Sequence, residues 1–121
     1  MAQSQEVIST NYPYLSVHVE IRGQKEEVLA LIDTGYTGDL VIPASWQIRV
    51  LGLPDGRSTV EVGDGRVVYA PVYLGILEII GFEPIPEVAV TVLGDEHILG
   101  QRILDHFEIT LDHGQRVIVR P

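Results

Sequence analysis

The sequence predicts an all-β fold, a sandwich or a barrel, with one short helix near the C-terminus. Two observations support this prediction. Short segments in which apolar and polar residues alternate recur along the chain, and turns rich in glycine and proline separate them. Apolar residues at helical spacing stand out in a single segment, which follows residue 100. The chain has 121 residues and is 45% hydrophobic, so we expect one domain, residues 1–121, with its own core.

The elements expected in the first part of the chain follow from this alternation. Residues 14–21 alternate strictly between apolar and polar side chains, which indicates a half-buried strand. A turn at 22–25 leads into a returning strand at 27–32. Residues 40–42 predict a further short strand, which Pro43 ends.

The second part of the chain contains the clearest hairpin. Residues 58–75 form it, and Gly63, Asp64 and Gly65 supply its turn, because these residue types accept the backbone angles of tight turns. The other expected elements are, in order, a helical turn or loop around Trp46 at 44–53, strands at 76–80 and 88–93, a helix at 101–107, and a closing hairpin that turns near His113 and Gly114.

Composition excludes several classes of function. The formal net charge of −9 repels phosphate, so we expect no nucleic-acid partner. The absence of cysteine excludes disulfides, thiolate nucleophiles and cysteine-based zinc sites, and the spacing of the four histidines fits no metal triad. We therefore expect no metal and no cofactor.

The ends of the chain and its apolar runs bear on location. Residues 1–12 are expected to form a polar N-terminal extension, and they lack the pattern of a secretion signal. Apolar runs in the sequence stay well short of the roughly 18 residues that cross a bilayer. The expectation is a cytoplasmic protein without a membrane partner.

Asp33 stands in the most apolar neighbourhood of the chain, within LIDTGYTGDLVIP. An ionised carboxylate there costs several kcal/mol unless it is paired or protonated. Gly35 would let backbone and substrate approach this acid closely, and the Thr34 hydroxyl could fix the loop. Two such acids about 3 Å apart share one proton, so that one can activate a water while the other protonates a carbonyl oxygen. The simpler alternative is that Asp33 only caps a turn.

This chemistry needs a second acid. The sequence contains no other Asp-Thr-Gly or Asp-Ser-Gly, and the nearest imitation, Asp112-His113-Gly114, falls at an expected hairpin turn. If the chemistry operates, the partner is Asp33 of a second copy, related to the first by a twofold axis.

Three features in this order resemble the retropepsin-like aspartic proteases, the single-lobed homodimeric relatives of pepsin. They are the motif Leu31-Ile32-Asp33-Thr34-Gly35, the glycine-tipped hairpin, and the later motif Ile98-Leu99-Gly100 that leads into a short helix. The resemblance covers the chain from about residue 14 to 119. It implies a closed acid-protease-like barrel of short strands with one short C-terminal helix, and an aspartic endopeptidase that hydrolyses peptide bonds.

The resemblance also implies roles for these residues. Asp33 of each subunit would form the catalytic dyad, Thr34 would hydrogen-bond across the dimer axis, and Gly35 would let substrate lie close. Gly63, Asp64 and Gly65 would form the tip of a flap that closes over the substrate. The last three, Ile98, Leu99 and Gly100, would pack behind the active-site loop.

Two positions depart from the retroviral members of that family. Tyr36 stands where they have a small residue, and Gln101 stands where they have an arginine, with Arg102 one position later. Asp39 is expected to be a solvated acid at the start of a strand. Two alternatives stay open at this point: a non-catalytic barrel that serves dimerisation or peptide binding, and a ligand-binding barrel with a cavity beside Tyr36 and Trp46.

Overall fold

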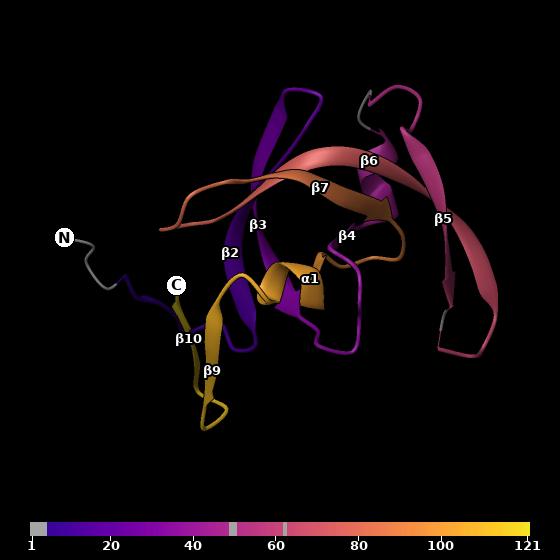
Figure 1. The fold of residues 1–121 in the computed structure, drawn as a ribbon. Coiled ribbons are helices and arrows are strands. Elements are labelled where there is room, and N and C mark those ends of the chain that lie inside the picture. The colour runs from indigo at the N-terminus through magenta and orange to yellow at the C-terminus, as the bar shows by residue number, and fades with distance from the viewer. Residues whose placement is uncertain (1–4, 49–50, 62) are drawn as a thin grey trace.

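The computed structural model describes residues 5–48, 51–61 and 63–121, and it confirms an all-β fold built around a closed barrel (Figure 1). Residues 1–4 of the expected extension, residues 49–50 beyond Trp46 and residue 62 of the expected hairpin lie outside the described residues. The elements are, in order, β1 (Val7–Ser9), β2 (Tyr14–Ile21), β3 (Gln24–Ile32), β4 (Leu40–Ile42), the 3-10 helix η1 (Ala44–Ile48), β5 (Gly56–Glu61), β6 (Val67–Ile79), β7 (Ile85–Val92), β8 (Ile98–Leu99), α1 (Gln101–Leu104), β9 (Glu108–Asp112) and β10 (Arg116–Arg120).

The barrel consists of six strands in the order β2-β3-β8-β4-β7-β6, and pairing of β6 with β2 closes it. Two pairs of neighbouring strands are parallel, β3 with β8 and β4 with β7, while the other neighbouring strands of the barrel are antiparallel. The strand β5 pairs with the first half of β6 and so lies outside the closed barrel. The barrel wall thus continues into a hairpin, β5–β6, that projects from it.

Alternating burial along the strands produces the core. On β2 the apolar side chains predicted to point inward, Leu15, Val17, Val19 and Ile21, are all at most 1% exposed. Each polar neighbour faces outward, as period-two geometry requires. Across the barrel these side chains join buried residues of every other barrel strand and of α1, including Ala30, Leu40, Leu77, Val90, Leu99 and Ile103.

One long strand replaces two that the sequence predicted. We expected a break near Gly75, but β6 runs without interruption over 13 residues. Gly75 is needed for close approach, since a Cβ atom there would lie 2.8 Å from the carbonyl oxygen of Glu20. The pairing register with β7 shifts between Gly75 and Leu77, which marks a bulge. The bulge lets one strand serve both the projecting hairpin and the barrel.

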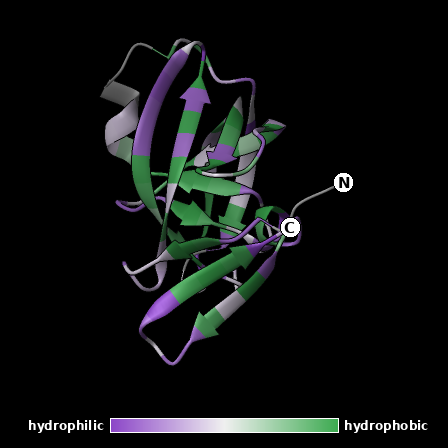
Figure 2. Cartoon of the chain, turned by 90° about the vertical axis from the view of Figure 1, so that its left-hand side faces the viewer, coloured by the Kyte–Doolittle hydropathy of each residue, from purple (hydrophilic) through white to green (hydrophobic). Residues whose placement is uncertain are grey.

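A second, three-stranded sheet has the order β1-β10-β9 and carries the closing hairpin that the sequence predicted. Figure 2 shows this hairpin projecting from the barrel with a hydrophilic turn at its far end. Residues 7–9, which we expected within a polar extension, instead pair with β10 along their length. Val7 packs against the core, and three residues are too few for alternation to reveal a strand.

The helix α1 is shorter than expected and ends at Leu104. After it the backbone makes three-residue turns, with the N–H of Phe107 donating to the carbonyl of Leu104 at 3.0 Å. Phe107 still packs inward, with its ring 5.0 Å from that of Phe82. In the described part of the chain, the helices lack the length and apolar character that crossing a membrane requires.

Candidate active site

Asp33 follows the last residue of β3, at the point where three barrel strands lie side by side. The short strand β8 runs between β3 and β4, parallel to the first and antiparallel to the second. Its residue Leu99 accepts the backbone N–H of Asp33 at 3.1 Å. The chain leaves β3 as a loop, residues 33–39, and returns to the same small region as β4. The pairing of β8 with both β3 and β4 fixes the position of Asp33 at the end of the barrel strands.

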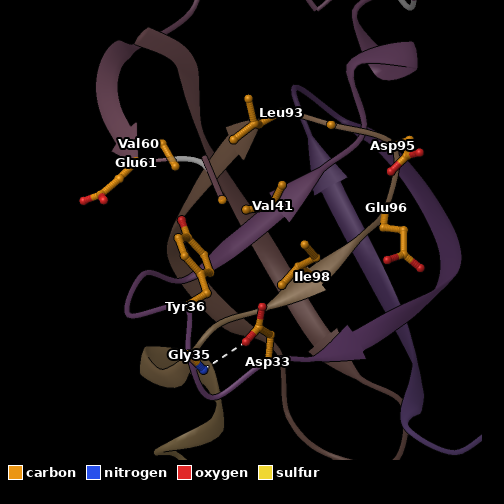
Figure 3. Close-up of a pocket in the computed structure, with 12 residues that line it drawn as sticks. Asp33, Gly35, Tyr36, Val41, Val60, Glu61, Leu93, Asp95, Glu96 and Ile98 are labelled. Atoms are coloured by element: carbon orange, nitrogen blue, oxygen red, sulfur yellow. Dashed lines mark hydrogen bonds between the residues drawn. The ribbon is translucent and has the colours of Figure 1, made fainter. Parts of the chain in front are cut away.

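The Asp33 carboxylate has two different surroundings. One oxygen, Oδ1, accepts the backbone N–H of Gly35 at 2.9 Å, so the turn-capping bond considered from the sequence is present. The other oxygen points toward a cavity (Figure 3). Gly35 permits this close turn, because a Cβ atom there would lie 3.2 Å from Oδ1. Capping therefore uses one oxygen and leaves the second facing the cavity.

The segment Ile98-Leu99-Gly100 and the start of α1 lie directly behind this loop. Backbone N–H groups of Gly100 and Gln101 donate to the carbonyls of Asp39 and Tyr36, both at 2.8 Å. The contact is so close that a Cβ atom on Gly100 would fall 2.1 Å from the carbonyl oxygen of Gly38. Only glycine fits at this position, and the loop therefore packs directly against the backbone of Gly100 and Gln101.

Asp39 is not the solvated acid that we expected. Its side chain is 15% exposed, and Oδ2 accepts the backbone N–H of Ala89 in β7 at 2.9 Å. Its other oxygen lies 3.1 Å from Nε of Arg102. The arginine that follows Gly100 by two positions thus makes an ion pair with the far end of the loop 33–39, although Gln101 takes the position next to Gly100.

The cavity in front of Asp33 has a volume of about 500 Å³ and lies between the barrel end and the β5–β6 hairpin (Figure 3). Its wall combines apolar side chains with carboxylates. The residues that line it are Asp33, Gly35, Tyr36, Val41, Val60, Glu61, Gly63, Leu93, Gly94, Asp95, Glu96 and Ile98. A mostly apolar concave site with a few convergent polar groups is the usual form of a ligand site.

The β5–β6 hairpin forms one side of this cavity through Val60, Glu61 and Gly63. Its turn contains the residues predicted for the tip, and Gly65 has a φ of +85°, which a glycine adopts without strain. Asp64 accepts both the backbone N–H and the side-chain Nε of Arg66, and these bonds hold the pKa of that carboxyl below its ordinary value. The tip therefore stabilises itself by local bonds.

At the opposite side of the cavity, Glu96 accepts a hydrogen bond from the Tyr14 hydroxyl at 2.6 Å. This bond to a carboxylate raises the pKa of Tyr14, because it stabilises the protonated hydroxyl. Neither this pair nor the Asp39–Arg102 pair was predicted. Their partners lie far apart in the sequence, and only the strand order β2-β3-β8-β4 brings them together.

The remaining candidates lie away from the cavity or are exposed. Thr34 is exposed on the loop. Trp46 is 3% exposed in the core and meets the ring of His97 edge-on, with centroids 6.0 Å apart, so it does not share an open cavity with Tyr36. His18 lies 2.8 Å from Glu78 on the outside of the barrel. Among the described residues, no three histidine or acidic side chains gather in a way that could hold a metal ion.

The fold is similar to that of a retropepsin-like aspartic protease from Rickettsia conorii. The two structures superpose with a TM-score of 0.66, over 99% of this chain and 94% of that chain, at 16% sequence identity. No protein-family model matches the sequence, and no curated protein matches it by sequence. The likeness therefore concerns the fold, and the chain has the retropepsin-like fold that its motifs predict.

Proposed function

We propose that this chain is an aspartic endopeptidase that is active as a homodimer. The observation that carries the proposal is the situation of Asp33: it lies at the base of a cavity in a retropepsin-like fold, with one oxygen held by Gly35 and the other facing the cavity. Such an arrangement holds a carboxylate in a defined orientation while leaving it accessible to a water and a substrate.

Catalysis would use two copies of Asp33 that meet across a twofold axis. Two aspartates about 3 Å apart cannot both be ionised, so the pair shares one proton. Pepsin is a standard example of this behaviour. One carboxylate would accept a proton from the attacking water, while the other would donate its proton to the carbonyl oxygen of the scissile amide. Thr34, which is exposed beside Asp33, would hydrogen-bond across the axis and hold the two loops in register.

Two features of the single chain support a dimer. The described residues contain one Asp-Thr-Gly, so the dyad requires a second copy. In addition, β9 forms an edge of the three-stranded sheet, and none of the described strands pairs with its outer side. An open edge offers unpaired backbone groups to which a second copy could add a strand.

The substrate would bind in extended form between the loop and the β5–β6 hairpin. Strand-like peptides gain affinity by backbone hydrogen bonds to an available strand, and their side chains fill pockets on alternating sides. Gly63, Asp64 and Gly65 would form a flap tip that closes over the substrate and excludes water. Apolar wall residues such as Val41 and Ile98 would then contact the substrate side chains.

The test is cleavage of a diverse peptide library, read by mass spectrometry from acid to neutral pH. Wild-type protein would be compared with Asp33→Asn, which keeps the shape of the side chain and its bond to Gly35 but cannot ionise. Both would be assayed with and without a statine-type inhibitor. The proposal predicts cuts that disappear with the substitution and with the inhibitor.

The contrasting result would be a correctly folded dimer that cuts nothing, or cuts that persist in Asp33→Asn. The first would favour the non-catalytic module that binds peptides or its own copy. The second would assign hydrolysis to another group or to a contaminant. Thermal unfolding of both proteins provides the control that the substitution leaves the fold intact.

A further inference from the structure

Tyr36 lies between two cavities that flank the active-site loop. The first is the cavity that contains Asp33. The second has a volume of about 510 Å³ and lies beneath the base of the β5–β6 hairpin. The residues that line it include Tyr36, Gly38, Asp39, Asp55, Arg57 and Arg102. Among the described residues that line the two cavities, Tyr36 alone belongs to both.

The ring of Tyr36 is held in this position by close contacts. A Cβ atom on Gly38 would lie 2.4 Å from the Tyr36 hydroxyl oxygen, and one on Gly100 would lie 2.6 Å from its Cδ2. The ring thus occupies space that is available only because Gly38 and Gly100 have no side chains. Its backbone is also fixed, since the N–H donates to Asp33 at 3.2 Å and the carbonyl accepts from Gln101 at 2.8 Å. The ring therefore separates the two cavities from a position that its close neighbours define.

The two cavities differ in the charge of their walls. The charged side chains that line the first are all carboxylates, those of Asp33, Glu61, Asp95 and Glu96. In the second, Asp39 pairs with Arg102 and Asp55 pairs with Arg22, which leaves Arg57 as the charged side chain outside these ion pairs among the described residues of the lining. An acidic side chain of a ligand would be repelled in the first cavity and accepted in the second.

We propose that Tyr36 is a specificity-determining wall that divides the substrate cleft into two separate side-chain sites. This inference rests on the proposed peptidase function. In an extended peptide, side chains on one face are about 7 Å apart, so residues i and i+2 can enter cavities on either side of one ring. The site beside Asp33 would take apolar or basic side chains, and the site beneath the hairpin would also admit acidic ones.

The test compares side-chain preference in wild type, Tyr36→Phe and Tyr36→Ala. Phenylalanine keeps the ring and should keep the wild-type preference at every peptide position. Alanine joins the two cavities, so peptides with Trp or Phe at one of the two positions should gain at least about tenfold in kcat/KM relative to peptides with Ala there, the scale on which pocket size discriminates. Tyr36→Leu, which still covers Gly38 and Gly100, replaces Tyr36→Ala if thermal unfolding shows that the latter does not fold.

A binding measurement separates this inference from the proposed function. The same library would be captured on immobilised Asp33→Asn carrying either Tyr36→Phe or Tyr36→Ala. Cleavage by wild type, together with an unchanged side-chain preference in Tyr36→Ala, would overturn the proposed role of Tyr36 but not the proposed peptidase function. Absence of cleavage, with captured peptides that still differ between the two variants, would overturn the peptidase and support the wall. Absence of both cleavage and capture would overturn both.

Discussion

Asp39 shows how many contacts a single residue can make at the end of the loop formed by residues 33–39. Its carboxylate joins β7, through the N–H of Ala89, to the guanidinium of Arg102, and its carbonyl accepts the N–H of Gly100. The sequence could not reveal this, because an acid after a glycine at the start of a strand is ordinarily solvated. The partners become neighbours only when the barrel closes.

The two partners of Asp39 should contribute unequally to stability. Arg102 has a side chain that is 75% exposed, and exposed ion pairs contribute at most about 1 kcal/mol, so Arg102→Ala should lower the free energy of unfolding by less than that. Asp39→Ala also leaves the N–H of Ala89 without its acceptor, and we expect a loss of about 1–3 kcal/mol. Urea unfolding of both variants measures this, and equal losses would show that the Ala89 bond adds nothing.

Asp33 could be predicted as a candidate because its motif consists of consecutive residues, whereas the cavity in front of it is built from segments that lie far apart in the sequence. The bond from Gly35 lies within three residues and could be anticipated from Asp-Thr-Gly. The cavity in front of it is assembled from the β5–β6 hairpin, from β4 and from residues 93–98. No spacing rule in the sequence joins these segments, so the acids Glu61 and Asp95 could not be recognised as its lining.

At the scale of elements, strict alternation gave the reliable predictions. The strand β2 was predicted with its correct bounds, because one face is buried throughout and the other is polar throughout. The strand β6 was split in two, since the predicted hairpin ended at Gly75 and a new strand began at residue 76, whereas Gly75 in fact lets β6 approach β2. A glycine in a strand can mark either the end of the strand or the close approach of another strand, and only the neighbouring backbone distinguishes the two.

Gly75 should therefore tolerate no side chain. In Gly75→Ala the new Cβ would lie 2.8 Å from the Glu20 carbonyl oxygen and 3.0 Å from Val90 Cγ2, and we expect a loss of about 1–3 kcal/mol of unfolding free energy. Gly56→Ala is the matched control, because Gly56 lies in β5 and no atom comes within 4 Å of a Cβ there. Chemical denaturation should leave the control unchanged or slightly more stable. Similar losses in both variants would refute the close approach.

The base of the β5–β6 hairpin is tied to the barrel by Asp55. Its carboxylate accepts the backbone N–H of Leu74 at 2.8 Å and pairs with Arg22 at 3.0 Å. The first of these bonds, and then the second, lower the pKa of Asp55. The ionised form is thus favoured by the folded state, so its contribution to stability is complete above the ordinary aspartate pKa and is lost as pH falls through the lowered value.

Asp55→Asn should make the stability of the protein less sensitive to acid. The amide can still accept from Leu74 but does not titrate, so the decrease in the urea midpoint from about pH 4 to pH 2 should be smaller than in wild type. The lowered pKa values of Asp64 and Asp112 leave part of the decrease in place. An equally steep decrease in Asp55→Asn would mean that the bonds of Asp55 do not contribute to folding.

At the scale of the whole molecule, the closed barrel and the projecting hairpin together enclose the cavity that contains Asp33. The barrel supplies Asp33 and the apolar floor, and the hairpin supplies the opposite wall. Fold class could be predicted from the sequence, since both the alternation and the order of the three motifs point to it. The sheet β1-β10-β9 could not, because it joins the two ends of the chain through a three-residue strand.

In the proposed homodimer, one active site needs Asp33 from two copies of the chain. The most direct test mixes a fixed amount of wild-type protein with increasing amounts of Asp33→Asn and follows cleavage of a single peptide after subunit exchange. Activity should fall as the mutant is added, in proportion to the fraction of wild-type chains that still pair with each other, because a mixed dimer contains only one ionisable Asp33. Adding a Glu83→Gln protein instead, a change at an exposed residue that lines neither cavity, should not lower activity. Cleavage that stays constant at any excess of Asp33→Asn would contradict a shared site.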